Sequence, residues 1–240
     1  MEINGKKAIV VGGASGMGRA SAELLAAKGA SVAILDREGS DGKDVAGALG
    51  GEFYAVDVTD FEGTETALAS AVDGLGGLHV IVTTAGGGIG ERTLGKAGVH
   101  SLDSFRKTID LNLIATFNIS RLAASHMAKN EPEDEERGVI INTASIAAFE
   151  GQIGQVAYTA AKAGIAGMCL TMARDLGSIG VRVLAIAPSL FATGLTKDAA
   201  FPKRLGRPEE YGKLVTAIVE NPMLNGQCLR LDAGQRFAPK

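Results

Sequence analysis

The sequence has little of what disulfide frameworks and metal sites require. Its only cysteines are Cys169 and Cys228, which lie far apart and form no ligand pattern. We therefore expect two buried, reduced thiols, as is usual in a cytoplasmic protein. The three histidines, His79, His100 and His126, form no cluster, and structural roles are expected for all of them. The sequence predicts no metal site.

Strong charge and long apolar runs are also missing. The formal net charge is −3, which gives no reason to expect nucleic acid or an anionic membrane as a partner. We expect no apolar run to approach the ~18 residues of a membrane span, and a strand that begins at Lys6 or Lys7 leaves no room for a signal peptide. Whether a segment was removed before the first residue of this chain is left open. The charge run 131–137 is interpreted as a solvated loop and not as a metal site.

What the chain does contain is a regular alternation of apolar strand segments and helical segments. Such alternation predicts crossover connections and a Rossmann-type α/β fold, with a parallel sheet that carries helices on both faces. With no repeat and no linker, we expect one domain over residues 1–240. The expected strands are 7–11, 31–35, 53–56, 78–83, 139–143, 182–187 and 227–231, and the expected helices are 19–28, 42–49, 61–75, 102–129, a helix from 155 onward, and 209–220.

A glycine-rich turn follows the first strand, with the spacing Gly12-x3-Gly16-x-Gly18. Strand, glycine-rich turn and helix in this order are typical of a phosphate-binding unit, because glycines allow the sharp turn and the helix presents free N–H groups to a pyrophosphate. The spacing differs from the usual G-x-G-x-x-G fingerprint. A turn with only a packing role is the alternative.

The second strand ends in Asp36, about 20 residues beyond the glycines. A carboxylate at this place can bind the ribose hydroxyls of NAD and repel the 2′-phosphate of NADP. Ser15 is not basic, which favours NAD, whereas Arg37 could instead receive a 2′-phosphate. The alternative is that Asp36 is a surface aspartate in a turn and binds no ribose.

Ser145, Tyr158 and Lys162 form the most informative constellation. Ser145 ends the apolar run 139–143, and Tyr158 and Lys162 stand one turn apart on the helix that follows. We expect the lysine to lower the pKa of the tyrosine and the serine to hold a carbonyl oxygen while the tyrosine transfers a proton. A helix cap and a surface Tyr–Lys pair are the alternatives.

Two further features lie at the predicted ligand edge of the sheet. The turn T-T-A-G (83–86) closes the fourth strand, and a long glycine-rich loop (87–101) follows it. Asn112 lies inside the expected helix 102–129, so it is either exposed or has a polar task. A plain turn is the alternative for T-T-A-G.

Taken together and in order, these motifs resemble the short-chain dehydrogenase/reductase family along nearly the whole chain. The resemblance rests on the glycine pattern, T-T-A-G, Asn112, Ser145, the Tyr158–Lys162 pair and the turn at Pro188. It implies Tyr158 as the acid/base, Ser145 as the carbonyl anchor, Lys162 as pKa modifier and ribose ligand, and Asn112 in a water relay. The residues implied to bind the dinucleotide are Gly12, Ser15, Gly16, Met17, Gly18, Asp36, Asp57, Val58, Thr84, Ala85, Gly86, Tyr158, Lys162, Pro188 and Phe191.

Within that family the segments F-N-I-S-R-L, I-A-A-F-E-G-Q-I-G-Q and I-A-P-S-L-F look most similar to members that act on 3-hydroxyacyl-CoA and on hydroxysteroids. The resemblance implies NAD-dependent interconversion of a secondary alcohol and a ketone, on an acyl thioester or another small alcohol or ketone, by a homotetramer. An NADPH-dependent 3-ketoacyl reductase and a non-catalytic dinucleotide-binding scaffold are the rival hypotheses.

Three positions depart from the family pattern. Thr83-Thr84 replaces a turn that usually carries asparagine, and Pro188-Ser189 replaces Pro-Gly. The segment 195–201 looks shortened within the expected substrate loop, 189–207. Because a CoA substrate needs cations near its phosphates, the candidates in this loop are Lys197, Lys203, Arg204 and Arg207.

Overall fold

The computed structural model describes residues 1–96, 98–191 and 199–237, and it contains the predicted parallel sheet. The sheet has seven strands in the order β3-β2-β1-β4-β7-β8-β9, and every neighbouring pair is parallel. The doubly wound fold class is therefore confirmed. The strands are β1 (Lys7–Val11), β2 (Ser31–Asp36), β3 (Glu52–Ala55), β4 (Val80–Thr83), β7 (Gly138–Thr143), β8 (Val181–Pro188) and β9 (Cys228–Leu231).

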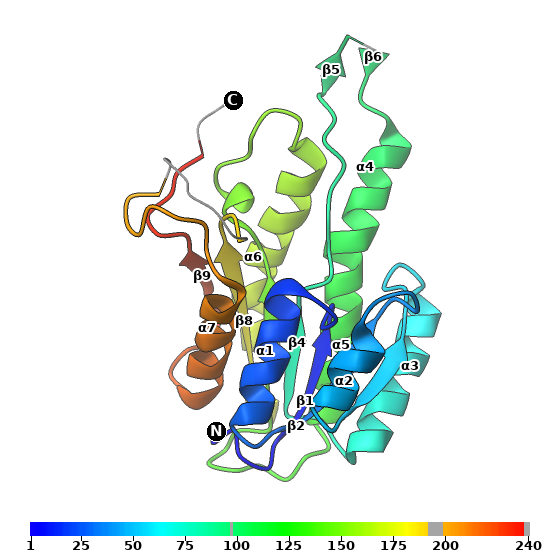
Figure 1. Ribbon diagram of the computed structural model, residues 1–240, viewed down its shortest axis with the longest axis vertical. Helices are drawn as coiled ribbons and strands as arrows, with labels where there is room; N and C mark the ends of the chain where they lie inside the picture. The colour runs from blue at the N-terminus through cyan, green and yellow to red at the C-terminus, as the bar shows by residue number, and fades with distance from the viewer. Residues whose placement is uncertain (97, 192–198, 238–240) are drawn as a thin grey trace.

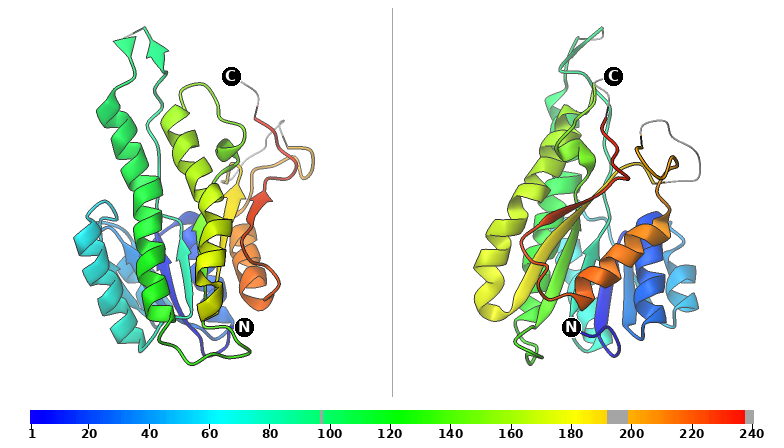
Figure 2. Two further views of the ribbon diagram at one scale, coloured as in Figure 1. Left: turned by 180° about the vertical axis from the view of Figure 1, so that it is seen from behind. Right: turned by 90° about the vertical axis from the view of Figure 1, so that its left-hand side faces the viewer.

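Helices cover both faces of this sheet (Figure 2). One layer consists of α1 (Gly16–Ala27), α2 (Gly42–Ala48) and α7 (Pro208–Glu220), and the other contains α3 (Phe61–Leu75), α4 (Leu102–Ile109), α5 (Ala115–Met127) and α6 (Val156–Leu176). The 3-10 turns η2 (Ile146–Ala148) and η3 (Gly177–Ile179) precede and follow α6.

The central strand shows why its sequence is an unbroken apolar run. Along β1, Ile9 and Val11 join the core under α3 and α5, while Ala8 and Val10 join the core under α1 and α7. All four side chains are completely buried. A strand that is buried on both faces cannot alternate polar and apolar residues, and this is the pattern of a parallel sheet.

The expected helix 102–129 is interrupted. A π-helical turn, η1 (Asp110–Ile114), lies between α4 and α5. Together they form a long rod that extends beyond the sheet, and a small hairpin, β5 (Leu94–Gly95) and β6 (Gly98–Val99), lies beyond its end (Figure 1). The hairpin falls in the loop 87–101, where glycine content hid any strand pattern.

The stretch Val156–Ile179 corrects one expectation, because it is long enough and apolar enough to cross a membrane by length and composition alone. In the fold, however, one face of α6 packs on the sheet through Ile165 and Cys169. The stretch is thus explained as a core helix of an α/β domain. Both cysteines are free, Cys169 buried and Cys228 half-buried.

Candidate active site

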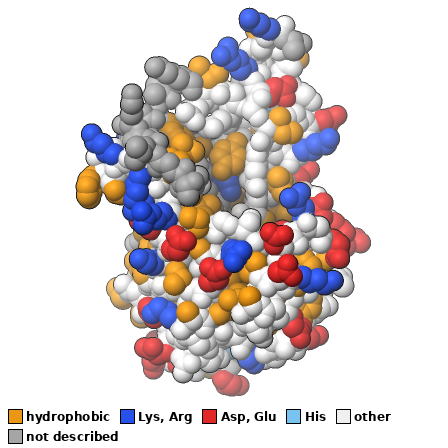
Figure 3. All heavy atoms as spheres, in the orientation of Figure 1, with side chains coloured by type: hydrophobic (Ala, Val, Ile, Leu, Met, Phe, Trp, Pro, Cys, Tyr) orange, Lys and Arg blue, Asp and Glu red, His pale blue; other side chains and the backbone are white. Residues whose placement is uncertain are grey.

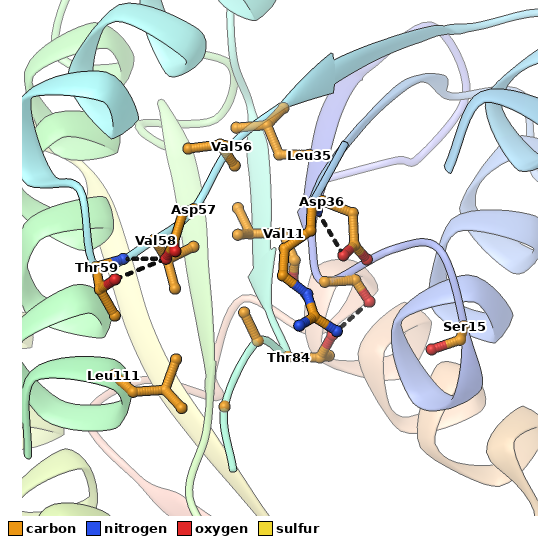
Figure 4. A pocket seen from close by; sticks show the side chains of 14 residues that line it. Val11, Ser15, Leu35, Asp36, Val56, Asp57, Val58, Thr59, Thr84 and Leu111 are labelled. Carbon is orange, nitrogen blue, oxygen red and sulfur yellow. Dashed lines mark hydrogen bonds between the residues drawn. The ribbon is translucent and has the colours of Figure 1, made fainter. Parts of the chain in front are cut away.

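The carboxyl ends of β1, β2 and β4 surround a pocket of about 460 Å³ (Figure 4). A parallel sheet collects ligands at this edge, because the loops that follow its strands diverge there. Eight residues predicted to bind the dinucleotide line this pocket: Gly12, Ser15, Asp36, Asp57, Val58, Thr84, Ala85 and Gly86.

The glycine-rich turn leaves no room for side chains at two positions. Gly12 has a φ of +81°, and a Cβ atom there would lie 2.6 Å from the backbone nitrogen of Ala85. A Cβ atom on Gly18 would lie 2.1 Å from the carbonyl oxygen of Gly12. Helix α1 begins directly at this turn, and Ser15 makes no side-chain capping bond to it. The free N–H groups of its first turn can therefore hold an anion.

Thr84 ties the end of β4 to this turn. Its hydroxyl lies 3.1 Å from the carbonyl oxygen of Val11 and 3.0 Å from that of Gly12. Asparagine is usual in this turn of the family, and the sequence left open what would replace its stabilising role. The threonine hydroxyl makes a comparable link between the two strand ends.

Two carboxylates face the pocket from neighbouring strand ends (Figure 4). Asp36 accepts hydrogen bonds from the N–H groups of Ala14 (3.0 Å) and Arg37 (2.8 Å). Asp57 accepts from the hydroxyl and the N–H of Thr59, and the hydroxyl bond above all lowers the pKa of its carboxyl group. Arg37 lines the same pocket, so both the carboxylate that favours NAD and the cation that could receive a 2′-phosphate are present.

Ser145, Tyr158 and Lys162 meet beside this pocket, as the sequence predicted. Ser145 caps η2 by accepting a 3.1 Å hydrogen bond from the N–H of Ala147, and its side chain is near enough to Tyr158 to lower the pKa of that residue. The ammonium nitrogen of Lys162 donates to the carbonyl oxygen of Thr143 at 2.7 Å. That lysine is only 3% exposed. The alternative that Tyr158 and Lys162 form an ordinary surface pair is therefore wrong.

The pKa shifts in the structure differ from the expectation that Lys162 lowers the pKa of Tyr158. Burial raises the pKa of Tyr158, and the hydrogen bond with Ser145 only partly opposes this. Burial also lowers the pKa of Lys162 to about 8. The ammonium group bonds to Thr143 and lies over the tyrosine ring, and desolvation is the largest cause of both shifts.

Asn112 is completely buried, which excludes the exposed alternative. Its side chain accepts from the N–H of Gly87 (3.1 Å) and donates to the carbonyl oxygens of Gly87 (2.6 Å) and Thr108 (2.8 Å). A Cβ atom on Gly86 would lie 2.7 Å from Asn112 Oδ1 and 3.4 Å from Lys162 Nζ. The π-helical turn therefore places Asn112 next to the lysine, and π-turns of this kind are frequent at functional sites.

A second pocket, of about 260 Å³, lies against Tyr158 and is lined by Gly87, Gly88, Ile89, Gly90 and Gln155. A Cβ atom on Gly88 would come within 3.0 Å of the tyrosine ring. Figure 3 shows this face of the molecule hollowed above α1, with hydrophobic side chains and one basic side chain visible at the floor. The glycine run thus leaves space for a small molecule beside Tyr158.

The remaining implied cofactor residues do not line the larger pocket. Met17 packs against the hydrophobic core, Pro188 ends β8, and Phe191 packs edge-on against Tyr211 with its ring next to Gly206. Their roles stay predictions, as do those of Gly16 and Gly18.

The cations of the expected substrate loop are in three different situations. Lys197 lies outside the described residues. Arg204 forms a two-pronged ion pair with Glu210, at 2.9 and 2.6 Å, while Lys203 and Arg207 are exposed. Within the described ranges 1–96, 98–191 and 199–237, no cluster of three or more acidic, histidine or cysteine side chains could hold a metal ion.

Sequence reasoning missed five residues of the larger pocket: Val11, Leu35, Val56, Thr59 and Leu111. Only Thr59 carried a signal, since an aspartate followed two positions later by threonine is typical of a turn closed by the aspartate side chain. The four apolar residues could not be distinguished from ordinary core positions.

Comparison with known proteins gives the same result from sequence and from structure. Residues 6–202 match the family described as short chain dehydrogenase. The human protein named 3-hydroxyacyl-CoA dehydrogenase type-2 is 47% identical, over 99% of this chain and 97% of that protein. The crystal structure of 3-hydroxyacyl-CoA dehydrogenase type-2 from Mycobacterium avium has a TM-score of 0.94 at 42% identity and covers 100% of both chains.

A more distant structure matches as well. A 7α-hydroxysteroid dehydrogenase, solved with NADH and 7-oxo glycochenodeoxycholic acid, has a TM-score of 0.85 at 27% identity and covers 100% of this chain and 97% of its own. The resemblance that the motifs suggested is therefore confirmed by all three comparisons.

Proposed function

The chain belongs to the short chain dehydrogenase family of oxidoreductases, and we propose that it interconverts 3-hydroxyacyl-CoA and 3-ketoacyl-CoA with NAD. The observation that carries the proposal is the meeting of Ser145, Tyr158 and the buried Lys162 between the glycine-lined pocket and the small pocket beside the tyrosine. A non-catalytic dinucleotide-binding scaffold would have no use for this arrangement.

The residues present fit a nicotinamide dinucleotide. Gly12 and Gly18 keep the turn so tight that a Cβ atom at either position would collide with it, and the N-terminus of α1 can hold the pyrophosphate. When bound, the dinucleotide supplies the hydride acceptor or donor. We favour NAD because the Asp36 carboxylate faces the pocket, where it can accept hydrogen bonds from a ribose diol and repel a 2′-phosphate.

The proton is handled by the protein. The Tyr158 hydroxyl, whose pKa the Ser145 side chain lowers, can give a proton to a carbonyl oxygen or take one from an alcohol. Ser145 can hold the same oxygen in place. The bond from Lys162 to Thr143 fixes a positive charge over the face of the tyrosine ring, and Asn112 keeps the neighbouring glycine turn in position.

The substrate class is inferred from the relatives. The human and Mycobacterium avium proteins are both named as 3-hydroxyacyl-CoA dehydrogenases and match over essentially the full chain. A hydroxysteroid is the second candidate, because the structure solved with a 7-oxo bile acid has the same fold at lower identity. An NADPH-dependent 3-ketoacyl reductase is disfavoured by Asp36.

The test is turnover of NADH with a short 3-ketoacyl-CoA, measured for the parent and for Tyr158→Phe. The variant loses the proton-transferring oxygen but keeps the ring, so we expect kcat to fall by about 10²–10⁴-fold, with an unchanged circular dichroism spectrum. Ser145→Ala should lower kcat in the same direction. Near-normal turnover by folded Tyr158→Phe would refute the mechanism, and oxidation of a hydroxysteroid in preference to the thioester would favour the second candidate.

We also propose that the protein is a homotetramer. Apolar side chains are exposed on the faces of the rod and of α6 that point away from the sheet, among them Phe117, Val156 and Leu170. Isologous pairing of such helices would bury these faces. Light scattering at micromolar concentration tests this, and a particle of 24.6 kDa would contradict it.

A further inference from the structure

Glu150 is attached to the turn that begins at Ser145. Its N–H donates to the carbonyl oxygen of Ile146 at 3.0 Å, and the N–H groups of Ala148 and Phe149 donate to Ser145 and Ile146. These bonds make residues 145–150 one compact turn. A displacement of Glu150 would therefore also displace the backbone of Ser145.

The carboxylate of Glu150 is held by the C-terminal part of the chain. Arg230 Nη1 lies 2.8 Å from Oε1, Arg236 Nε lies 3.3 Å from the same oxygen, and the N–H of Phe237 donates to Oε2 at 3.0 Å. The side chain is only 20% exposed, and hydrogen bonds to a charged group in such surroundings are stronger than neutral ones.

The donors belong to a segment that is closed on itself, residues 230–237, which we call the C-terminal hook. Asp232 bonds to Arg230 at 2.7 Å and to Arg236 at 3.1 Å, and it accepts from the N–H of Gly234 at 3.0 Å. The Gln235 side chain is almost completely buried. Two arginines and two carboxylates, counting Glu150, thus neutralise one another, and the hook is a defined structure that can resist displacement.

The same hook is bonded to the expected substrate loop, 189–207. The carbonyl oxygen of Ala233 accepts from the N–H groups of Ala200 (3.0 Å) and Phe201 (3.3 Å), which precede α7. Ala233 itself has a φ of +51°, a backbone conformation that a residue with a Cβ atom adopts only when its surroundings enforce it. One short segment is therefore bonded both to the turn of Ser145 and to the segment between β8 and α7.

Catalytic geometry is sensitive to small displacements. A misplacement of 1 Å can cost about 100-fold in rate, and a hydroxyl on a turn is placed only as well as the turn is supported. At the other end of the loop, Tyr158 lies on α6 and does not need the hook. Loss of the Glu150 contacts would thus move Ser145 relative to Tyr158 and leave the dinucleotide pocket intact.

From these contacts we infer that Glu150 is a positioning residue, which uses the C-terminal hook, chiefly Arg230, to hold Ser145 in register with Tyr158. The inference rests on the proposed function, because it assigns Glu150 a task in the same reaction. It concerns neither cofactor binding nor direct contact with the substrate.

The test uses Glu150→Gln, Arg230→Gln and the double variant that combines these two changes. The control is Glu220→Gln, which removes a carboxylate from the Lys28 pair (2.7 Å) at the opposite edge of the sheet. We expect kcat for reduction of a short 3-ketoacyl-CoA to fall about 10- to 100-fold in Glu150→Gln, with an NADH dissociation constant within about twofold of the parent value. The double variant should be no worse than the worse single one, because both remove the same link. The control should behave like the parent.

A pH profile separates positioning from loss of stability. The hydrogen bond from Ser145 lowers the pKa of Tyr158, so a displaced Ser145 should raise the apparent pKa in the profile of kcat/KM, whereas a merely less stable enzyme keeps the parent profile. Should Glu150→Gln fail to fold, Arg236→Gln removes the contact of an exposed arginine with Glu150 and should shift kcat and the profile in the same direction by a smaller amount.

The outcomes separate this inference from the proposed function. If Tyr158→Phe is inactive but Glu150→Gln keeps the kcat and pH profile of the parent, the inference is wrong and the proposed function stands. Additive losses in the double variant would also overturn it. A parent protein that reduces no ketone with NADH would overturn both.

Discussion

Lys162 Nζ lies 5.6 Å from the centre of the Tyr158 ring, over its face, and directs its hydrogen bond to Thr143. The lysine is buried in the free protein, where a charged ammonium group is costly. The helical spacing of the pair predicts the contact but not this cost. The first prediction concerns the stability that the protein loses by keeping the lysine.

Replacing Lys162 by Met should stabilise the protein near neutral pH while it removes activity. The lowering of the lysine pKa from 10.5 to about 8 corresponds to about 3 kcal/mol of destabilisation, and loss of the bond to Thr143 takes back about 1 kcal/mol. A net gain of about 1–2 kcal/mol is expected in chemical denaturation at pH 7.

The pH dependence has a definite sign. Below pH 8 the lysine is protonated in both folded and unfolded protein, so its full cost is present. Between about pH 8 and 10.5 the unfolded state binds more protons than the folded one, so the stability of the parent rises relative to the variant. The advantage of Lys162→Met should therefore vanish or reverse by pH 10.5. If the difference in stability between the parent and Lys162→Met stays constant from pH 7 to 10.5, the lysine does not destabilise the protein through its lowered pKa.

Cofactor choice depends on Asp36 and Arg37, which both line the pocket. We expect NAD(H) to be preferred to NADP(H) in kcat/KM. Charge-assisted hydrogen bonds are worth about 1.5–3 kcal/mol, so Asp36→Ser should narrow the preference by about 10- to 100-fold. Arg37→Ala is the matched control and should widen it. Equal use of both cofactors by the parent would show that the arginine outweighs the aspartate.

The hydroxyl of Thr84 should support dinucleotide binding without touching the phosphates. Thr84→Val removes the link to Val11 and Gly12, which costs about 1 kcal/mol of hydrogen bonding in the turn. We expect the dissociation constant of NADH, measured by its own fluorescence, to rise several-fold in Thr84→Val. Thr84→Ser keeps the hydroxyl and should bind like the parent; weak binding by both variants would assign the effect to the methyl group.

The sheet was predictable because its central strands are buried on both faces, so that β1, β7 and β8 each carry an apolar run of three or more residues. The positions of Ser145 and Tyr158 were predictable for the same reason, since a strand end and a helix start fix them. The π-helical turn at Asn112 was not, because its support is a contact with Gly87, far away in sequence.

Other features depend on quantities that a one-dimensional pattern does not contain. The raised pKa of Tyr158 follows from burial, which only the packed fold determines. Glu150 carried no signal at all, because its partners come from the other end of the chain. Sequence spacing therefore identified residues whose partners are close in sequence, and it missed residues whose partners are distant in sequence.

The final prediction concerns how a CoA thioester would be held. Lys203 and Arg204 are adjacent in sequence, and the sequence suggested both as phosphate ligands, but Arg204 is paired with Glu210 at 2.6 Å and their ion pair lowers the pKa of that carboxyl to about 2. An arginine engaged in this way supports the start of α7, whereas Lys203 is exposed.

We therefore expect Lys203→Ala to raise KM for a short 3-ketoacyl-CoA by about two- to fivefold, the range of a single exposed ion pair, and to leave KM for a small uncharged ketone unchanged. Salt should raise KM for the thioester alone, since it screens phosphate contacts. Arg204→Ala should impair both substrates, because it disturbs the loop itself. Lys213→Ala, which removes an exposed lysine farther along α7, is the control. If Lys203→Ala changes both substrates alike, the lysine does not contact phosphate, and a substrate without CoA becomes the better explanation.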